Sequence, residues 1–424
     1  MSRVFTMLVI VTTALAWLLS LLPSPLVAQE ATTSKAAPFL LAEAITRARA
    51  VAPQRQAAQA RIQAAEGSVR QAQRPPNPLL DFHQENLGAG SPLDQILDVF
   101  ATVSQTVEIG GKRAARTAVA AADVKIAQAT ALQAERNLTL ETVRLYLAAL
   151  QAHASLEFLS KNREELQILI AAQTRRLEEG YAAEADLMKF HTEASRLDTR
   201  LLRVQLDYNR SLTALSLLLD LSPPLTGARL VMPSILAPPR GDPLELAQQV
   251  VERQPEIIVA QAQLDRAQQT VALEKANRLP DPALTVGYKR TGGADTLVTG
   301  VTMPLPVFDG NSGNIERAVA EEHAAAMDLA ALRKQHLLAI KVLIQSAQEL
   351  AAQEQNIERQ MLQSAEIVRN AAHVSFREGA ADILHLVDAE RVYTETRQEA
   401  LELKLEAYVK TFEAQLLLSK EGQP

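Results

Sequence analysis

The stretch RPPNPLL, residues 74–80, occurs again with small changes as RLPDPAL, residues 278–284. Both stretches belong to a longer repeat, in which residues 40–222 and 244–420 show the same features about 200 positions apart. Each copy has a helical segment, a pair of strands opened by prolines, and a very long helix. A repeat of this length predicts a pseudo-symmetric architecture rather than two independent enzymes.

The composition of the chain favours helices. Hydrophobic residues make up 47% of the 424 residues but aromatic residues only 4%, so the apolar content is mainly Ala and Leu, which are good helix formers. The net charge of −6 is spread along segments in which both signs mix, and this argues against a nucleic-acid partner. Residues 221–243, between the two copies, are the one stretch that resembles a linker.

The first residues, 1–28, are predicted to be a signal peptide, in which Arg3 precedes an apolar run and Ala28 ends a cleavage site. No other window of about 20 residues is apolar enough for a membrane-spanning helix. The sequence also contains no cysteine, which excludes disulfides, thiolate metal sites and a lipid-modified cysteine anchor. These features are compatible with a soluble periplasmic protein or with an outer-membrane β-barrel.

Two very long helices are predicted at residues 111–178 and 312–378, since these runs are almost free of proline and glycine. At ~1.5 Å per residue, each could extend roughly 100 Å. Apolar residues within them recur at alternating spacings of three and four, which is typical of coiled coils. Shorter return helices with the same spacing are predicted at 184–220 and 382–420.

Each repeat is also predicted to contain a pair of strands, at about residues 79–109 in repeat one (29–236) and 283–308 in repeat two (237–424). In the second pair, apolar residues alternate with small or polar ones over roughly 9 to 11 residues, the length at which a tilted strand crosses a bilayer. Four strands cannot close a barrel, and open strand edges are not tolerated in lipid. Chains would therefore have to associate, and three copies would give a barrel of about twelve strands.

An aromatic girdle at the membrane surface would depend on few residues. Trp17 is the single tryptophan, and it lies in the predicted signal peptide. The aromatic residues in or near the predicted strands that could form a girdle are Phe82, Phe100, Tyr288 and Phe308.

The two strand-to-helix corners carry a family resemblance. They read QTVEIGGKRAAR (105–116) and PLPVFDGNSGNIERA (304–318). Together with the double repeat and the Glu-Gly hairpin tips, they resemble the TolC family of outer-membrane efflux proteins. Within that family they are similar to the heavy-metal branch, which serves cobalt-zinc-cadmium type exporters of the resistance-nodulation-division class. The resemblance covers nearly the whole mature chain.

The resemblance implies a mainly α fold with a small β part, in which a duplicated repeat of long coiled-coil-like helices and four membrane strands forms a trimeric α/β barrel duct. The homotrimer would lie in outer-membrane lipid, with a periplasmic extension. Its partners would be a periplasmic adaptor and an inner-membrane resistance-nodulation-division pump. A passive duct of this kind requires no catalytic residue, metal site or cofactor. Drug efflux and type I protein secretion stay open as alternatives to a heavy-metal cargo.

The same resemblance implies functional residues at the two hairpin tips. The turn residues that match those presented to the adaptor are Gly180, Tyr181, Gly379 and Ala380. The positions that match the acidic residues narrowing the periplasmic aperture are Asp186, His385 and Asp388. A threefold ring of carboxylates favours cations, whereas in a purely structural role Asp186 would stabilise a helix N-terminus. Protonation of His385 would make the aperture pH sensitive, and a simple surface histidine would not.

Two other protein classes stay open at this point. A periplasmic coiled-coil adaptor would explain the export signal and the heptads, but it should carry a compact β-domain instead of amphipathic strands. An exported enzyme would need His, Asp or Ser side chains gathered in loops. The seven histidines show no His-Glu-x-x-His pattern, and Gly-Gly-Lys at 110–112 lacks the flanking residues of a phosphate-binding loop.

Overall fold

The computed structural model describes residues 38–85, 98–181, 183–234 and 236–419. The predicted signal peptide, residues 1–28, lies outside the described residues. The described helices and strands belong to one structural unit, which begins at Phe39.

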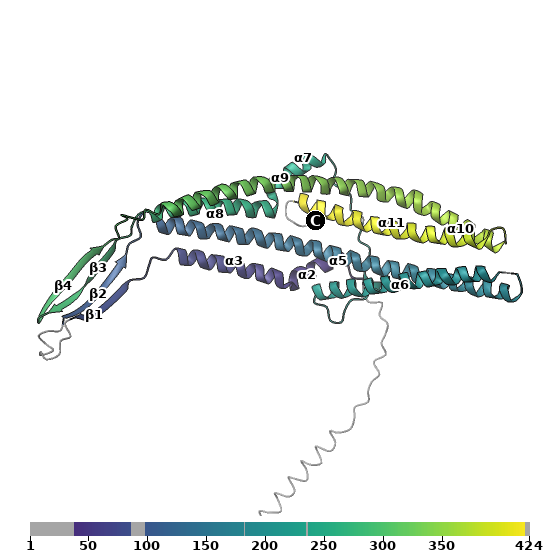
Figure 1. The fold of residues 1–424 in the computed structure, drawn as a ribbon, viewed down its shortest axis with the longest axis horizontal. Coiled ribbons are helices and arrows are strands. Elements are labelled where there is room, and N and C mark those ends of the chain that lie inside the picture. Colours follow the sequence, from purple (N-terminus) through teal and green to yellow (C-terminus); the bar gives the residue numbers. More distant parts are fainter. Residues whose placement is uncertain (1–37, 86–97, 182, 235, 420–424) are drawn as a thin grey trace, which may run out of the picture. The chain divides into compact units, whose positions relative to one another are not determined.

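In the described residues, the first half of the chain contains two helices, two strands and a hairpin of two longer helices (Figure 1). In order, these are α2 (Leu41–Val51), α3 (Pro53–Ala72), β1 (Leu79–Glu85), β2 (Asp98–Thr106), α5 (Lys112–Glu178) and α6 (Glu184–Leu218).

The second half repeats this order. Its elements are α7 (Pro243–Val250), α8 (Pro255–Asn277), β3 (Ala283–Thr291), β4 (Ala294–Thr302), α9 (Ser312–Asn356), the π-helical segment η4 (Ile357–Leu362), α10 (Gln363–Arg377) and α11 (Ile383–Leu418). The predicted fold class, a duplicated and mainly α-helical chain with a small β part, is confirmed. None of the described helices combines the length and the apolar character needed to cross a membrane.

Local sequence explains how the matching helices begin and how far they run. Pro53 and Pro255 each occupy the first turn of their helix, where the backbone N–H has no intrahelical partner. Helix α5 continues for 67 residues, roughly 100 Å at ~1.5 Å per residue. In the second half, α9, η4 and α10 together cover the matching stretch, with one wider turn at Ile357–Leu362.

The helices pack side by side. On the side of the strands, α3 packs against α5, α5 against α8, and α8 against α9. On the other side, α6 packs against α5, and α11 packs against α9 and α10 (Figure 1). Each half of the chain therefore ends in a helical hairpin, at the opposite end of its long helix from its strands.

The four strands form one antiparallel sheet in the order β1-β2-β3-β4, so that β2 and β3 join the two halves. The register places apolar residues of neighbouring strands on one face of the sheet, since side chains alternate with a period of two. This apolar face carries Leu80, Phe82, Val103, Val286, Tyr288, Leu297 and Val301. The opposite, polar face carries Asp81, His83, Thr102, Ser104, Thr285, Lys289 and Thr296.

The predicted contribution of Phe100 to an aromatic girdle is wrong, because Phe100 lies on the polar face. Its ring stacks on His83 with centroids 4.5 Å apart, and the Nζ atom of Lys289 lies 4.6 Å from its centroid. Both contacts follow from the register, which sets Phe100 between these two residues. Phe82 and Tyr288 do lie on the apolar face, and Phe308 follows the end of β4.

Hydrogen bonds join the linker-like segment between the two halves to other parts of the chain. Phe39 donates a backbone hydrogen bond to Arg229 at 2.8 Å, which ties the start of the described chain to this segment. Further on, Gln415 of α11 donates to the carbonyl of Ala237 at 2.7 Å, and Gln348 of α9 donates to that of Pro239 at 2.8 Å. The segment thus crosses from one half of the molecule to the other as a packed element.

Tyr146 of α5 lies at the centre of the largest apolar cluster, which α2, α5, α6 and α11 form together. The side chain is fully buried. Its hydroxyl lies 2.7 Å from the carbonyl oxygen of Phe39 and 2.8 Å from that of Val231, and it accepts a hydrogen bond from the Val231 N–H at 3.0 Å. Burial raises the pKa of this phenol, so the hydroxyl stays protonated and able to donate. One side chain therefore holds two distant backbone segments on α5.

We expect Tyr146→Phe to lower the stability of the folded protein by about 1–3 kcal/mol, because buried backbone groups lose their partner while the ring volume is kept. The measurement is the midpoint of thermal unfolding of the purified protein. Tyr181→Phe, which alters a phenol that is 76% exposed, serves as the control and should leave the midpoint unchanged. Equal midpoints for Tyr146→Phe and the parent protein would contradict this role.

Candidate functional site at the hairpin tips

The two hairpins turn through the same backbone motif. Gly180 and Gly379 have φ angles of 80° and 75°, in the left-handed region that favours glycine. The residue after each glycine donates to the carbonyl five positions earlier, Tyr181 to Arg176 at 2.7 Å and Ala380 to Ser375 at 2.8 Å. This pattern is the Schellman motif, which satisfies the last carbonyls of a helix. Both turns are thus specified locally, by a glycine at the matching position.

The residues predicted to dock the adaptor lie at these two turns. Gly180, Tyr181, Gly379 and Ala380 are all exposed. The ring of Tyr181 is not covered by its own chain. An added Cβ would meet no atom within 4 Å at either glycine, so the backbone angle rather than lack of space requires glycine there. The structure thus leaves these turns accessible, and their docking role stays a prediction.

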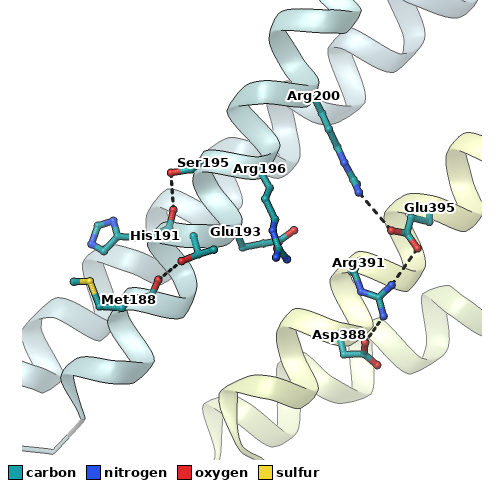
Figure 2. A network of polar contacts seen from close by, with 10 residues as sticks. Met188, His191, Glu193, Ser195, Arg196, Arg200, Asp388, Arg391 and Glu395 are labelled. Atoms are coloured by element: carbon teal, nitrogen blue, oxygen red, sulfur yellow. Dashed lines mark hydrogen bonds and ion pairs between the residues drawn. The ribbon is translucent and has the colours of Figure 1, made fainter.

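The predicted aperture residues lie at the start of the two return helices. Asp186 is in the first turn of α6 and accepts a hydrogen bond from Lys189 at 3.0 Å. Asp388 lies further along, in α11, and accepts one from Arg391 at 2.6 Å (Figure 2). Both carboxylates are therefore paired with a basic residue one turn away. The place of Asp186 also agrees with its structural reading as a carboxylate at a helix N-terminus.

His385 occupies the first turn of α11, where its backbone N–H donates to Asp382 at 3.1 Å. Its side chain is exposed. Within the described part of the chain, no hydrogen bond or ion pair joins Asp186 to His385 or to Asp388. A single chain therefore places the three residues near its two tips without bringing them into contact.

Polar contacts between the two hairpins were not foreseen from the sequence. Arg369 of α10 joins the two hairpins through Glu165 of α5 at 2.5 Å, and within its own hairpin it pairs with Glu390 of α11 at 2.9 Å. His373 contacts the same Glu390 carboxylate oxygen. The guanidinium of Arg369 also lies 4.8 Å from the centroid of the Tyr393 ring. The side chain of Arg369 is only 17% exposed and that of Glu390 24%, so their contact is largely shielded from solvent, whereas Glu165 is 39% exposed.

Two further links join the hairpins. Asn162 of α5 donates to Thr394 of α11 at 3.1 Å. Arg200 of α6 extends to Glu395 of α11 at 3.4 Å, and Glu395 also contacts Arg391 (Figure 2). The two partners are 232 positions apart in the first link and 195 in the second. Each residue by itself looks like an ordinary charged or polar residue on a helix surface. No spacing rule would have paired them.

Apolar side chains lie close to these links. Phe190, Ile383 and Leu386 are almost fully buried and form a small cluster near the tips. The ring of Phe190 meets that of Phe376 edge to face, with centroids 6.3 Å apart. The hairpins are therefore held together by apolar packing near the tips and by polar contacts beside it.

Glu390 is the carboxylate that both Arg369 and His373 contact, so its charge affects both interactions. Burial raises the pKa of this carboxyl, but hydrogen bonds from His373 and Arg369 and the charge of Arg369 together lower it by more, so the pKa lies below its ordinary value of 4.5. Stabilisation by the ionised group is complete above that ordinary value and is lost as the pH falls through the lower, folded-state pKa.

The described residues contain no group of three or more His, Cys, Asp or Glu that could hold a metal ion.

A family model described as "Outer membrane efflux protein" matches residues 44–220 and 246–416, the two halves of the repeat. The chain is 27% identical over 347 residues to the Cobalt-zinc-cadmium resistance protein CzcC of Cupriavidus metallidurans, covering 80% of each chain. It is 27% identical over 288 residues to the Nickel and cobalt resistance protein CnrC of the same organism, covering 67% of this chain and 68% of the relative. The crystal structure of the outer membrane protein VceC from Vibrio cholerae has the same fold, with a TM-score of 0.74 and 20% identity over 89% of this chain and 95% of that one.

We expect Glu390→Gln to loosen the packing of α10 on α11 at pH 7 by about 1–3 kcal/mol, because Arg369 and His373 lose a charged acceptor. Arg369 would then be held less firmly for its contact with Glu165 of the other hairpin. Hydrogen exchange of the tip amides should be faster in this variant. In the parent protein, the same increase should appear only when the pH falls below about 4.5.

Glu399→Gln is the matched control, since Glu399 is exposed on the same helix. It should behave like the parent protein at both pH values. Tip exchange that responds to acid equally in Glu390→Gln and in the parent would remove Glu390 from this role.

Proposed function

Since the chain belongs to the outer membrane efflux protein family and is an outer-membrane efflux channel, we propose that three copies assemble into a passive duct that leads from the periplasm through the outer membrane. The predicted family and the predicted location are confirmed by the match of both halves to the family model. The trimer, its partners and its cargo are parts of the proposal.

The observation that supports the trimer is the four-stranded sheet. Its one face is apolar and suits lipid, and its other face is polar and suits a water-filled lumen. Within the part of the chain that the structure describes, the outer edges of β1 and β4 pair with no further strand. Unpaired backbone groups are unstable in hydrocarbon, so β4 of one copy would pair with β1 of the next. Three sheets of this kind make a closed barrel of about twelve strands.

The helical hairpins supply the periplasmic part of the proposed duct. Their long helices start at the strands, so three copies would continue the barrel as a wall of helices. The exposed turns at Gly180, Tyr181, Gly379 and Ala380 would receive a periplasmic adaptor, which links the duct to an inner-membrane pump of the resistance-nodulation-division class. The energy of transport would come from that pump.

We propose divalent heavy-metal cations as the cargo. The support comes from CzcC and CnrC, whose names assign them to cobalt-zinc-cadmium resistance and to nickel and cobalt resistance. A wide polar conduit binds its cargo weakly, so selection would occur mainly at the pump. The duct itself needs only to favour positive charge along its narrowest part.

Deletion of this gene should lower the tolerated concentration of cobalt, zinc or cadmium, because pumped cations would lack an exit from the periplasm. The measurement is growth over a series of metal concentrations, with a panel of drugs tested in parallel. Re-expression of the chain should restore metal tolerance. Drug hypersensitivity with unchanged metal tolerance would favour the drug-efflux alternative, and a loss of one secreted protein would favour type I secretion.

The proposed aperture gives a second test. Asp186→Asn combined with Asp388→Asn should lower the preference of single channels for cations over anions, because six carboxylates would be removed from the ring in a trimer. The measurement is the reversal potential in a salt gradient. Asp198→Asn combined with Asp207→Asn, farther along α6 from the tip, is the control pair. Equal reversal potentials for the aperture variant and the parent channel would remove both positions from the aperture.

A further inference from the structure

The polar face of β1 carries three side chains of types that commonly bind metal ions. Asp81, His83 and Glu85 alternate along the strand, so they project from the same face of the sheet. The Nδ1 atom of His83 lies 3.5 Å from Asp81, and its Nε2 atom lies 3.7 Å from Glu85. Each ring nitrogen of one histidine is therefore beside a different carboxylate.

Neither carboxylate is paired with a lysine or an arginine in the part of the chain that the structure describes. The predicted aperture residues differ in this respect, because Asp186 and Asp388 each have a basic partner one turn away. The ammonium group of Lys289, on the same face of the sheet, lies over the ring of Phe100. The side chains at 81, 83 and 85 are 55%, 43% and 57% exposed, so a dissolved cation can reach them.

The imidazole of His83 is held in one orientation by its neighbour on β2. Its ring stacks on Phe100 with centroids 4.5 Å apart and only 9° between the ring planes. The register sets the two residues directly opposite each other. A ring that is already oriented loses little freedom when it binds a ligand, which favours binding.

The second half of the chain forms the matching strand without these side chains. Alignment of RPPNPLL with RLPDPAL pairs the residues Asp81, His83 and Glu85 with Thr285, Gly287 and Lys289. Strand β3 is nevertheless paired along its length on both sides. The strand therefore does not require the pattern Asp-x-His-x-Glu, and its presence on β1 needs another explanation.

The spacing suits a cation that is shared by the imidazole and one carboxylate. Zinc binds nitrogen and oxygen at about 2.0–2.2 Å, so two ligand atoms at a bond angle of roughly 90–110° lie about 3.0–3.4 Å apart. The observed 3.5 and 3.7 Å need only a small side-chain rotation to reach this separation. A neutral imidazole has one free nitrogen, so the cation takes His83 together with either Asp81 or Glu85, and water supplies its other ligands.

We propose that Asp81, His83 and Glu85 form a transient binding site for a divalent transition-metal cation in the lumen of the barrel. The site rests on the proposed function, in which the polar face of the sheet lines the lumen and such cations are the cargo. Imidazole with carboxylate suits zinc, cobalt or nickel better than magnesium. Two protein ligands are fewer than in permanent zinc sites, and weak binding is what a cation that must leave the duct requires.

A single indole beside the site allows a direct test. In a full-length Trp17→Phe background, Phe100→Trp places the one tryptophan of the chain against the ring of His83. Paramagnetic Co²⁺ bound at the site should quench its fluorescence in a saturable way in the detergent-solubilised protein. Zn²⁺ should displace Co²⁺ and restore the signal. Mg²⁺, which prefers oxygen ligands, should not.

Variants in the same background identify the ligands. His83→Phe keeps an aromatic ring against position 100 and removes the imidazole, so it should raise the Co²⁺ concentration for half quenching by roughly 10–100-fold, the loss that changes around a metal site commonly cause. Asp81→Asn combined with Glu85→Gln should have a similar effect. Leu297→Trp with Phe100 retained, on the apolar face of the sheet, is the control and should show no saturable quenching.

Equal quenching of His83→Phe and its parent, or no saturable quenching of the parent, would overturn the site. Displacement of Co²⁺ by Mg²⁺ as readily as by Zn²⁺ would also overturn it, since negative charge alone would then explain the binding. The assay reads binding and not transport, so it is independent of the proposed cargo. Binding at His83 together with unchanged metal tolerance of the deletion strain would support the site and count against the cargo.

Discussion

The constraint on which this architecture depends is the pairing of backbone groups at the edges of the sheet. A strand edge exposes a row of N–H and C=O groups, and hydrocarbon offers them no partner. The described part of the chain contributes four strands with an apolar face, too few to close on themselves. In the proposed membrane placement of the sheet, assembly of several copies would therefore be a condition for insertion. The prolines before β1 and after β4 limit the free edges to the length of the strands, so backbone pairing and lipid contact end at about the same level.

In the proposed duct the helical part lies in water, so ion pairs can contribute to its packing. Near the tips, apolar contacts around Phe190 hold the hairpins together, and the shielded Arg369 network lies beside them. Apolar packing is insensitive to direction, whereas ion pairs require one relative position of their partners. Together they give the two hairpins a defined register. A slide of one hairpin past the other would separate the partners of the ion pair between Arg369 and Glu165.

Much of this fold was predictable from local patterns. The repeat, the runs without proline, and the glycines at 180 and 379 are features of neighbouring residues, and they predicted the helices and their turns. The placement of Phe100 was not predictable in the same way, because it follows from the register between β1, β2 and β3. The contact of Arg369 with Glu165 is a similar case, since it joins residues about 200 positions apart whose charges look like ordinary surface charges. Neighbouring residues determine where helices and turns form, whereas contacts such as that of Arg369 with Glu165 depend on how the helices are placed relative to each other.

For the predicted aperture residues, too, the sequence and the structure supply different information. The family resemblance pointed to Asp186 and Asp388, and the structure adds that each has a basic partner one turn away, Lys189 and Arg391. In the proposed trimer, three copies of each carboxylate would approach one another, and bare carboxylates at short distance repel strongly. A cation from the same helix lowers that repulsion, so the ring can narrow without an external counterion. The same pairing reduces the field that a passing ion meets, and a preference for cations then depends on the carboxylates lying closer to the axis than their partners. In the proposed trimer, cation preference at the tips would therefore depend on how the copies converge, which composition alone cannot determine.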